Sequence, residues 1–378
     1  MDFPLFPYRV SFDSAGFDFG WAPEGPGVFA LETAGEPFLG KSANLRRRLT
    51  RLLAETALED AALGKEKKRR SLNLRAATLA IHYRPAGSAF ETSLALYRAA
   101  RALFPANYRD RLRLRVPPLL RVSYRNPYPR CSVSRRIGRG PGVVYGPFPS
   151  RAAAEKFASD ALDLFKVRRC VETIVPDPKH PGCIYGEMNM CLRPCQAACT
   201  AEEYQAETGR LVEFFSTGGG SLVRELEQHR DSASAQMNFE EAARLHKSIE
   251  KARDSARQSP ELAADLERLN GVVVQAAAAS SAVALFPVWR GFILDEITFP
   301  LEMPEGKPVS MDARLKEALG GIRFTGGSPR VRGEHLALLA RWFYRGTRKG
   351  EFVAFDTFEK PPYRRIVGAI SRVVRQSK

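Results

Sequence analysis

"GPGVFALETAGEPFLGKSANLRRRL" (residues 25–49) is the stretch that decides the N-terminal fold. GVFAL and EPFLG have the composition of short strands, and the turn TAGE between them contains a glycine. A helix is expected to begin near Asn44, because asparagine caps helix N-termini, and to continue as ANLRRRLTRLLAETALEDAAL. Three consecutive arginines near its start are suited to holding a phosphodiester.

The rest of residues 20–110 completes a small α/β unit. The basic connection GKEKKRRSLNLR (64–75) leads to a third expected strand, AATLAIHYRP. A second helix, FETSLALYRAARALF, is expected to end before Pro105, because proline cannot continue a helix.

Composition favours a polyanionic partner. The chain has 378 residues, enough for two to four compact units, and 44% of them are hydrophobic. Lys and Arg number 58 against 42 Asp and Glu, which gives a net charge of +16. Nucleic acid is the usual partner of such a surplus, although a merely basic soluble protein would show the same balance.

The sequence also indicates the cellular compartment of the protein. No run offers the roughly 18 apolar residues of a membrane span. The N-terminus MDFPLFPYRVSFDS lacks the basic and apolar regions of a signal peptide. We therefore expect a cytoplasmic protein with no membrane partner, in which cysteines are thiols or metal ligands and not disulfides.

Residues 111–165 are expected to form a basic linker with a helix. Alternation and Pro/Gly punctuation indicate short strands before the helix SRAAAEKFASDALDLF. Tyr124 and Tyr128 are interleaved with arginines, a combination that suits contacts with DNA backbone and bases. A solvated hairpin with core tyrosines is the alternative. The candidate DNA-binding arginines here are Arg125, Arg130, Arg135, Arg136 and Arg139.

Five of the six cysteines lie in a cysteine-rich segment, residues 166–200. The spacing is Cys170-x12-Cys183-x7-Cys191-x3-Cys195, with Cys199 four residues further on. Paired C-x2-C knuckles, which zinc usually favours, are absent, so uneven spacing with a C-x3-C end fits a [4Fe–4S] cluster better. Cys199 could replace Cys195 as the fourth ligand, since both could share a helical face with Cys191.

The expected secondary structure changes twice in the C-terminal half of the chain. Residues 201–256 are almost wholly helical, with breaks at STGGGS and near DSASAQMN. Residues 265–378 are expected to form an α/β region, with strands in GVVVQAAAASSAVALFPVWRGFILDEITFPL and helices at MDARLKEAL and EHLALLARWFYR. The whole chain is therefore predicted to be an α+β multidomain protein.

Four segments, in this order, resemble the bacterial excinuclease protein UvrC, the incision component of nucleotide excision repair. GVF…FLGKSANLRRRL is similar to its GIY-YIG nuclease motif, and SRRIGRGPGVVYGPFPS to a block before the cysteines. The cysteine spacing with CLRPC resembles its iron–sulfur site, and MNFEEAARLHKSIEKAR (237–253) its UVR motif, a helical hairpin that docks on the excinuclease component UvrB. Residues 265–378 look more weakly like the family's middle region.

The resemblance implies roles for particular residues. A small GIY-YIG-like domain is implied for residues 20–110, with Arg48 and Lys41 as remnants of its catalytic site and phosphate contacts from Arg46, Arg47 and Arg51. The alternative is that these arginines form a solvated helix face and that Lys41 caps a turn. The cluster ligands implied are Cys170, Cys183, Cys191 and Cys195.

Several positions depart from the family's nuclease motif. Phe29 and Phe38 replace the two motif tyrosines and lose both hydroxyls. An ungapped alignment puts Leu96 where the metal-binding glutamate belongs and Tyr108 where the family has asparagine. Glu91 is five residues before Leu96, which places it about 140° around the helix from the required direction. Loss of a metal ligand costs orders of magnitude in rate, so the site is expected to lack activity.

A predicted UVR motif in residues 201–256 implies a partner surface. Asn238 is a suitable helix N-cap, followed by acidic residues in the first turn. An internal hairpin that packs only on itself is the alternative. His246 and Lys247 replace an Arg-Asp pair of the family, which changes the charge of the docking surface. The apolar stripe expected to contact UvrB consists of Phe239, Ala242, Ala243, Leu245 and Ile249.

Three hypotheses follow. The first is a UvrC-like repair protein that binds DNA and UvrB without a competent nuclease site; it would also lack the family's ribonuclease H-like and helix-hairpin-helix domains, and with them the 5′ incision. The second is an active endonuclease that nicks 3′ to a lesion with Mg²⁺ or Mn²⁺, held by a carboxylate such as Glu91. The third is a protein-interaction module with an incidental basic face.

Overall fold

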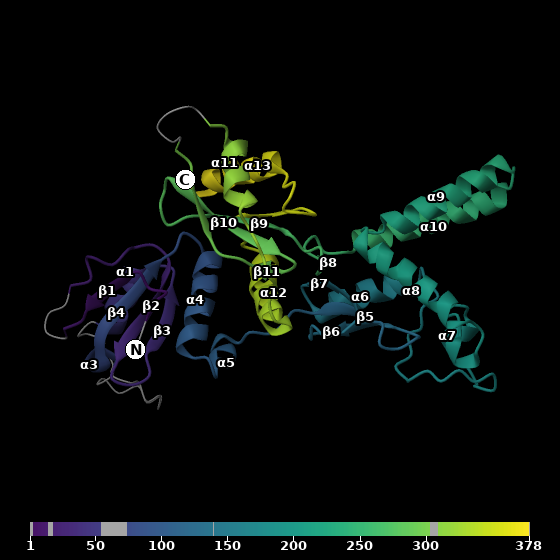
Figure 1. Ribbon diagram of the computed structural model, residues 1–378, viewed down its shortest axis with the longest axis horizontal. Coiled ribbons are helices and arrows are strands. Elements are labelled where there is room, and N and C mark those ends of the chain that lie inside the picture. Colours follow the sequence, from purple (N-terminus) through teal and green to yellow (C-terminus); the bar gives the residue numbers. More distant parts are fainter. Residues whose placement is uncertain (1–2, 14–17, 54–73, 139, 303–308, 378) are drawn as a thin grey trace.

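The computed structural model describes residues 3–13, 18–53, 74–138, 140–302 and 309–377. Its described part is elongated, with an N-terminal unit at one end, a helical hairpin at the other and a C-terminal unit between and above them (Figure 1). Three separate antiparallel sheets and many helices confirm the α+β multidomain prediction. None of the described helices is long and apolar enough to cross a bilayer.

The N-terminal unit is a four-stranded antiparallel sheet, in the order β1-β4-β2-β3, with helices on both faces. Its elements are β1 (Tyr8–Ser11), β2 (Gly27–Thr33), β3 (Phe38–Ser42), α1 (Leu45–Leu53), α3 (Leu74–Ala77), β4 (Thr78–Pro85), α4 (Ala89–Leu103) and α5 (Tyr108–Leu112). Alternation along β2 sends Phe29 and Leu31 towards α1, and Val28 and Ala30 towards α4. The helix expected over residues 43–63 is described only to Leu53.

The middle unit begins with residues 111–165, which were expected to form a basic linker with a helix and instead form most of a sheet and helix α6. The short strands anticipated there pair as β6-β5-β7-β8, and the last strand arrives from beyond the hairpin. Phe157, Tyr204 and Phe214 belong to the core beneath this sheet. The unit comprises β5 (Leu119–Ser123), β6 (Cys131–Ser134), β7 (Gly142–Gly146), α6 (Arg151–Leu162), α7 (Ile184–Glu187), the 3₁₀ turn η1 (Pro194–Gln196), α8 (Ala201–Ser216) and β8 (Ala264–Asp265).

Two long helices, α9 (Gly220–Ala235) and α10 (Phe239–Arg257), form an antiparallel hairpin that projects from the middle unit (Figure 1). The Asn238 side chain accepts a hydrogen bond from the Glu241 amide and so caps α10, as its position in the sequence predicts. Met237 completes the turn with a φ of 57°, a left-handed conformation that is unusual for a non-glycine residue.

The C-terminal unit is a five-stranded antiparallel sheet with different helices on its two faces. The strands follow the order β11-β10-β9-β13, and β12 also pairs with β10. Helices α11 and α13 pack on one face and α12 on the other. Its elements are β9 (Gly271–Ala276), β10 (Ala282–Trp289), β11 (Phe292–Ile293), β12 (Ile297–Pro300), α11 (Met311–Gly320), α12 (Pro329–Phe343), β13 (Glu351–Ala354) and α13 (Tyr363–Ser377).

Helix α12 joins all three units. Leu336 and Leu338 pack in one core with Leu94 of α4 and Leu119 of β5. The Tyr344 hydroxyl, just after α12, donates to the Pro147 carbonyl oxygen of the middle unit at 2.6 Å. Figure 1 shows α12 between the N-terminal unit and the middle sheet. The units are therefore packed together through one helix.

Candidate nucleic-acid interface and cysteine site

The two phenylalanines at the expected tyrosine positions lie close together in the N-terminal unit. Their ring centroids are 6.0 Å apart, and Phe29 is fully buried. The ring of Phe29 also fills the space above Gly40, where a Cβ atom would come within 2.6 Å of it. This part of the motif is an apolar contact without a hydroxyl group that could position water.

The expected metal-binding position is also apolar. Leu96 lies on α4 in a cluster with Phe3, Phe6, Val28 and Ala30. The N-terminal segment of the chain thus packs over the place where the family resemblance would put a carboxylate. Among the described residues, the cluster around Leu96 is apolar and offers a divalent cation none of the oxygen ligands that it requires.

Glu91, the alternative metal ligand, points elsewhere. Its carboxylate accepts a hydrogen bond from the Gly87 amide at 2.7 Å and lies near Glu296 and Arg84, at the contact with the C-terminal unit. Burial, and secondarily the Glu296 carboxylate, raises the pKa of Glu91 to about 7. Its position stabilises the start of α4 and leaves it far around the helix from Leu96.

The arginines of α1 divide into two groups. Arg46 serves the fold, since its guanidinium donates to the carbonyl oxygens of Ala22 and Gly20 and pairs with Glu24 at 2.6 Å. Arg47 and Arg51 are exposed, and Arg48 is half-buried. For these three, the described residues provide no side-chain hydrogen bond or ion pair, so they remain the candidates for phosphate contacts.

Lys41 and Tyr108, two further motif positions, both contact neighbouring elements. The Lys41 ammonium donates to the Ser93 hydroxyl of α4 at 3.2 Å. The Tyr108 hydroxyl donates to the carboxylate of Glu334 on α12 at 2.9 Å. The position of the family's asparagine therefore contributes to the packing of two units.

The middle sheet presents part of the expected basic surface. Arg125, Arg135 and Arg136 are exposed, and Arg130 is half-buried. The Arg125 guanidinium lies against Gly140, at a distance of 2.7 Å from where a Cβ would stand. Arg139 lies outside the described residues.

The two tyrosines between these arginines differ. Tyr124 is 39% exposed and accessible to a base. Tyr128 packs edge-on against the buried Tyr204, with ring centroids 5.5 Å apart. Tyr128 therefore matches the core alternative, whereas Tyr124 remains a stacking candidate.

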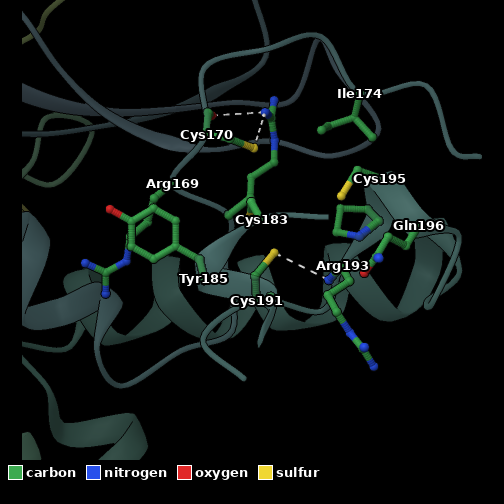
Figure 2. A pocket seen from close by; sticks show the side chains of 12 residues that line it. Arg169, Cys170, Ile174, Cys183, Tyr185, Cys191, Arg193, Cys195 and Gln196 are labelled. Atoms are coloured by element: carbon green, nitrogen blue, oxygen red, sulfur yellow. Dashed lines mark hydrogen bonds between the residues drawn. The ribbon is translucent and has the colours of Figure 1, made fainter. Parts of the chain in front are cut away.

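Four cysteines line one pocket: Cys170, Cys183, Cys191 and Cys195. Figure 2 shows these side chains around the pocket, together with Arg193 and Tyr185. Cys199 is absent from the pocket and packs against the core of the middle unit. The structure thus groups the four cysteines of the expected ligand set and separates Cys199 from them.

Backbone and guanidinium donors face the sulfur atoms. The Arg193 amide donates to the Sγ of Cys191 at 3.4 Å, and an Arg168 guanidinium nitrogen lies 3.5 Å from the Sγ of Cys170 (Figure 2). Burial raises the pKa of Cys191 to about 11, and the neighbouring cysteines contribute to the same direction. Within the described chain, no three His, Cys, Asp or Glu side chains converge tightly enough to hold one metal ion.

Arg168 is a residue that the sequence analysis missed. It is 4% exposed and donates to the carbonyl oxygens of Tyr128, Cys170 and Glu172. It therefore fixes the first part of the cysteine segment against the β5–β6 loop. The only sequence signal was its place two residues before Cys170 in VRRC, where it resembles any other arginine of a basic chain.

The hairpin buries part of the apolar stripe that was expected to contact UvrB and leaves the rest of it exposed. Leu245 and Ile249 are buried, and Ala242 is half-buried. Ala243 is exposed, and Phe239 is 67% exposed beside Met237, which is 78% exposed. Available apolar surface is thus concentrated at the tip, where α9 turns into α10 (Figure 1).

Comparison with known proteins identifies the middle unit. Residues 118–214 match the family model of the UvrC/Cho excinuclease middle domain. This match runs from β5 through most of α8 and includes the cysteine pocket. It ends well before residues 265–378, so the expected resemblance of that segment to the family's middle region is wrong.

Curated relatives agree. The chain is 25% identical to the UvrABC system protein C of Lachnospira eligens over 55% of this chain and 34% of the relative, and 27% identical to that of Methylococcus capsulatus over 59% and 35%. It is 31% identical to that of Chromohalobacter salexigens over 36% of this chain and 22% of the relative. The chain is UvrC-like over about half its length, and its match spans about a third of the first two relatives. No solved structure matches it.

Proposed function

We propose that this protein acts in nucleotide excision repair in the cytoplasm, where it binds DNA and the excinuclease component UvrB without a competent nuclease site in its N-terminal unit. The observation that carries the proposal is the UvrC/Cho middle-domain match, which includes the four-cysteine pocket and the exposed Arg135 and Arg136 that follow β6. The relatives' name, UvrABC system protein C, supports the same assignment.

DNA binding is supported by exposed basic residues on two units, for which the described residues provide no side-chain ion pair. Arg47 and Arg51 are exposed on α1, and Arg135 and Arg136 are exposed at the end of β6. Guanidinium groups bind phosphate through two parallel N–H donors, which places the protein on the duplex without reading its sequence. The net charge of +16 favours association with such a polyanion.

Absence of nuclease chemistry is supported by the packing of the motif positions. Hydrolysis of a phosphodiester requires a positioned water molecule and oxygen ligands that hold a divalent metal ion. Phe29 and Phe38 supply no hydroxyl, Leu96 lies in an apolar cluster, and the Glu91 carboxylate accepts a hydrogen bond from the Gly87 amide just before α4. The rival hypothesis, a nuclease that holds Mg²⁺ or Mn²⁺ through Glu91, has no support from this arrangement.

A [4Fe–4S] cluster fits the cysteine pocket better than a single ion. Zinc would hold its thiolates about 2.3 Å from one centre. The four thiols instead surround a pocket that also receives N–H donors directed at two of the sulfur atoms. Such donors stabilise cluster thiolates, and a bound cluster would cross-link the segment and could exchange one electron. Arg168 would then orient Cys170, and the Arg193 amide would stabilise the Cys191 thiolate.

Contact with UvrB is assigned to the tip of the hairpin. Phe239 supplies the largest exposed apolar side chain of the predicted stripe, and Met237 adjoins it. Leu245 and Ile249 hold α10 against α9 and so support the tip from within. A flexible thioether beside an aromatic ring is a suitable contact for a partner helix.

A binding experiment tests the proposal. A labelled lesion-bearing duplex is mixed with the protein in the absence of UvrA and UvrB, and a slower-migrating complex is expected. The quadruple variant Arg47→Ala, Arg51→Ala, Arg135→Ala and Arg136→Ala should weaken this complex strongly, and more so in higher salt. Undiminished binding by that variant would favour the third hypothesis, a protein-interaction module with an incidental basic face.

A further inference from the structure

Two arginines from different units flank one buried carboxylate. The Nε atoms of Arg109 on α5 and Arg330 on α12 lie 3.3 and 3.4 Å from the same oxygen atom, Oε1 of Glu334. The Glu334 side chain is 1% exposed and also accepts hydrogen bonds from the hydroxyls of Tyr97 and Tyr108. The carboxylate therefore holds two guanidinium groups side by side, one from the N-terminal unit and one from the C-terminal unit.

These two guanidinium groups carry more positive charge than the shared carboxylate neutralises. The side chain of Arg109 is 41% exposed and that of Arg330 is 57% exposed, so both are open to solvent. Asp110, the acidic residue of α5, is exposed and forms no ion pair with either arginine in the described structure. One positive charge of the pair therefore remains available to an anion.

The connection between the N-terminal unit and the middle unit passes close to this pair. Val116 packs on α12 at Gly333, where an added Cβ atom would come within 2.9 Å of its side chain. Gly333 lies about one helix turn after Arg330. Leu114 is buried in the same core against which Val116 packs, whereas Arg115 between them is exposed. Arg115 is thus a third cation at this end of α12.

The middle unit adds a fourth arginine. Ile137 also lies over Gly333, with a side-chain carbon 3.8 Å from where a Cβ atom would stand. Arg136 directly precedes Ile137 and is exposed. For Arg115 and Arg136, the described residues provide no side-chain hydrogen bond or ion pair. Arginines of all three units therefore gather around the first two turns of α12, which lies between α5 and β6 (Figure 1).

The carboxylates at α12 leave this group of arginines with surplus charge. Glu334 is buried and serves two of them at once. A second carboxylate at α12, that of Glu267, pairs with Arg332 at 2.7 Å and is already engaged. The N-terminal end of a helix is itself positive, which adds to the field at this point. A polyanion is the partner that such a surface favours.

We propose that four arginines at the junction of the three units bind consecutive phosphates of duplex DNA: Arg109, Arg115, Arg136 and Arg330. This inference rests on the proposed function and adds a contact between its two basic surfaces, on α1 and after β6. Guanidinium groups bind phosphate through paired N–H donors, and the buried carboxylate already orients two of them. The site exists only while the units are packed together, so DNA binding stabilises that packing.

The test compares two variants with the same change in charge. Arg115→Gln/Arg330→Gln removes one junction arginine from the connection and one from α12, and leaves Arg109 to pair with the buried carboxylate. Arg364→Gln/Arg365→Gln removes two exposed arginines of α13, which packs on the other face of the C-terminal sheet from α12. Affinity for an undamaged duplex is measured by fluorescence anisotropy at several salt concentrations.

The junction variant is expected to bind about tenfold more weakly at about 0.15 M salt, with a salt dependence shallower by about 1.8, since each phosphate contact contributes about 0.9. The α13 variant should bind as the wild type does. If the junction variant fails to fold, Arg115→Gln alone should show about half the change in slope, because this exposed side chain has no part in holding the buried carboxylate.

Equal affinities and slopes for the wild type and the folded junction variant would overturn the inference. An equal loss in the α13 variant would trace the effect to net charge and would also overturn it. The proposed function would survive either result if Arg47→Gln/Arg51→Gln still weakened binding. A wild-type protein that did not bind DNA at all would overturn both the inference and the proposed function.

Discussion

The hydroxyl of Tyr108 donates a hydrogen bond to the Glu334 carboxylate at 2.9 Å, across the contact between α5 and α12. Tyr97 of α4 donates to the same carboxylate at 2.8 Å, and Arg109 and Arg330 lie within 3.4 Å of it. A carboxylate that is 1% exposed is thereby paired and hydrogen-bonded, as a buried charge must be. Two tyrosines of the N-terminal unit thus hold the C-terminal unit in place.

Replacing Tyr108 with phenylalanine should lower the free energy of unfolding by about 2 kcal/mol, because a hydrogen bond to a buried charged group is lost. Urea denaturation followed by circular dichroism measures the change. Tyr124→Phe removes the hydroxyl of a tyrosine that is 39% exposed and should change stability little. Equal stability of the two variants would show that the Tyr108–Glu334 bond does not hold the units together.

Glu91→Gln should make stability less dependent on pH. The folded-state pKa of Glu91 is about 7, above its ordinary value of 4.5, so its contribution to stability is complete below pH 4.5 and is lost as pH rises through 7. Glutamine stays neutral and can still accept from the Gly87 amide. Between pH 5 and pH 8, the variant should gain about 2.5 kcal/mol relative to the wild type.

Denaturation curves at both pH values check this result. Glu240→Gln removes the same charge from an exposed position on α10 and serves as the control. If the difference in stability between Glu91→Gln and the wild type did not depend on pH, the pKa of Glu91 would not be raised by burial and by the Glu296 carboxylate.

Serine at any of the four pocket cysteines should abolish iron binding. After anaerobic purification, we expect iron and acid-labile sulfide in the wild type and a brown colour that Cys191→Ser lacks, since a hydroxyl is a poor ligand for cluster iron. Cys199→Ser is the matched control, because this cysteine belongs to the same segment and lies outside the pocket. A colourless wild-type protein, or loss of iron in Cys199→Ser alone, would contradict the assignment.

Two substitutions at the hairpin tip test the partner contact and the stability of the turn. Phe239→Ala should weaken binding to UvrB by at least about tenfold, the effect of removing an aromatic anchor worth about 2 kcal/mol. Met237→Gly should stabilise the turn by up to about 1 kcal/mol, since its φ of 57° suits glycine. Calorimetric titration and thermal unfolding measure the two effects. Undiminished binding by Phe239→Ala would place the contact elsewhere.

The sequence pattern predicted local features better than long-range ones. The strand pair within residues 25–42, the helix cap at Asn238 and the grouping of four cysteines all follow from neighbouring residues or spacing. Periodicity also located α11 and α12. Each of these signals lies within one short segment, where residue type and spacing determine the backbone directly.

Contacts between segments that are distant in the sequence could not be predicted from local patterns. Arg46 and Arg47 are adjacent and chemically identical, yet the structure uses Arg46 to hold the Gly20–Glu24 loop and leaves Arg47 exposed. Leu245 and Ile249 belong to an apolar stripe, but the pattern did not reveal that α9 covers them. Glu334 resembles a surface glutamate in the sequence, and only its tertiary neighbours make it a buried acceptor.

The most direct test of the central claim is an incision assay. A labelled duplex with one lesion is preloaded with UvrA and UvrB, and the protein is added with Mg²⁺ or Mn²⁺, alongside Arg48→Ala. The account predicts a bound complex and no nick 3′ to the lesion, because Phe29 and Phe38 carry no hydroxyl group and Leu96 carries no carboxylate. A 3′ nick that disappears in Arg48→Ala would contradict it, and would show that this unit still cuts DNA.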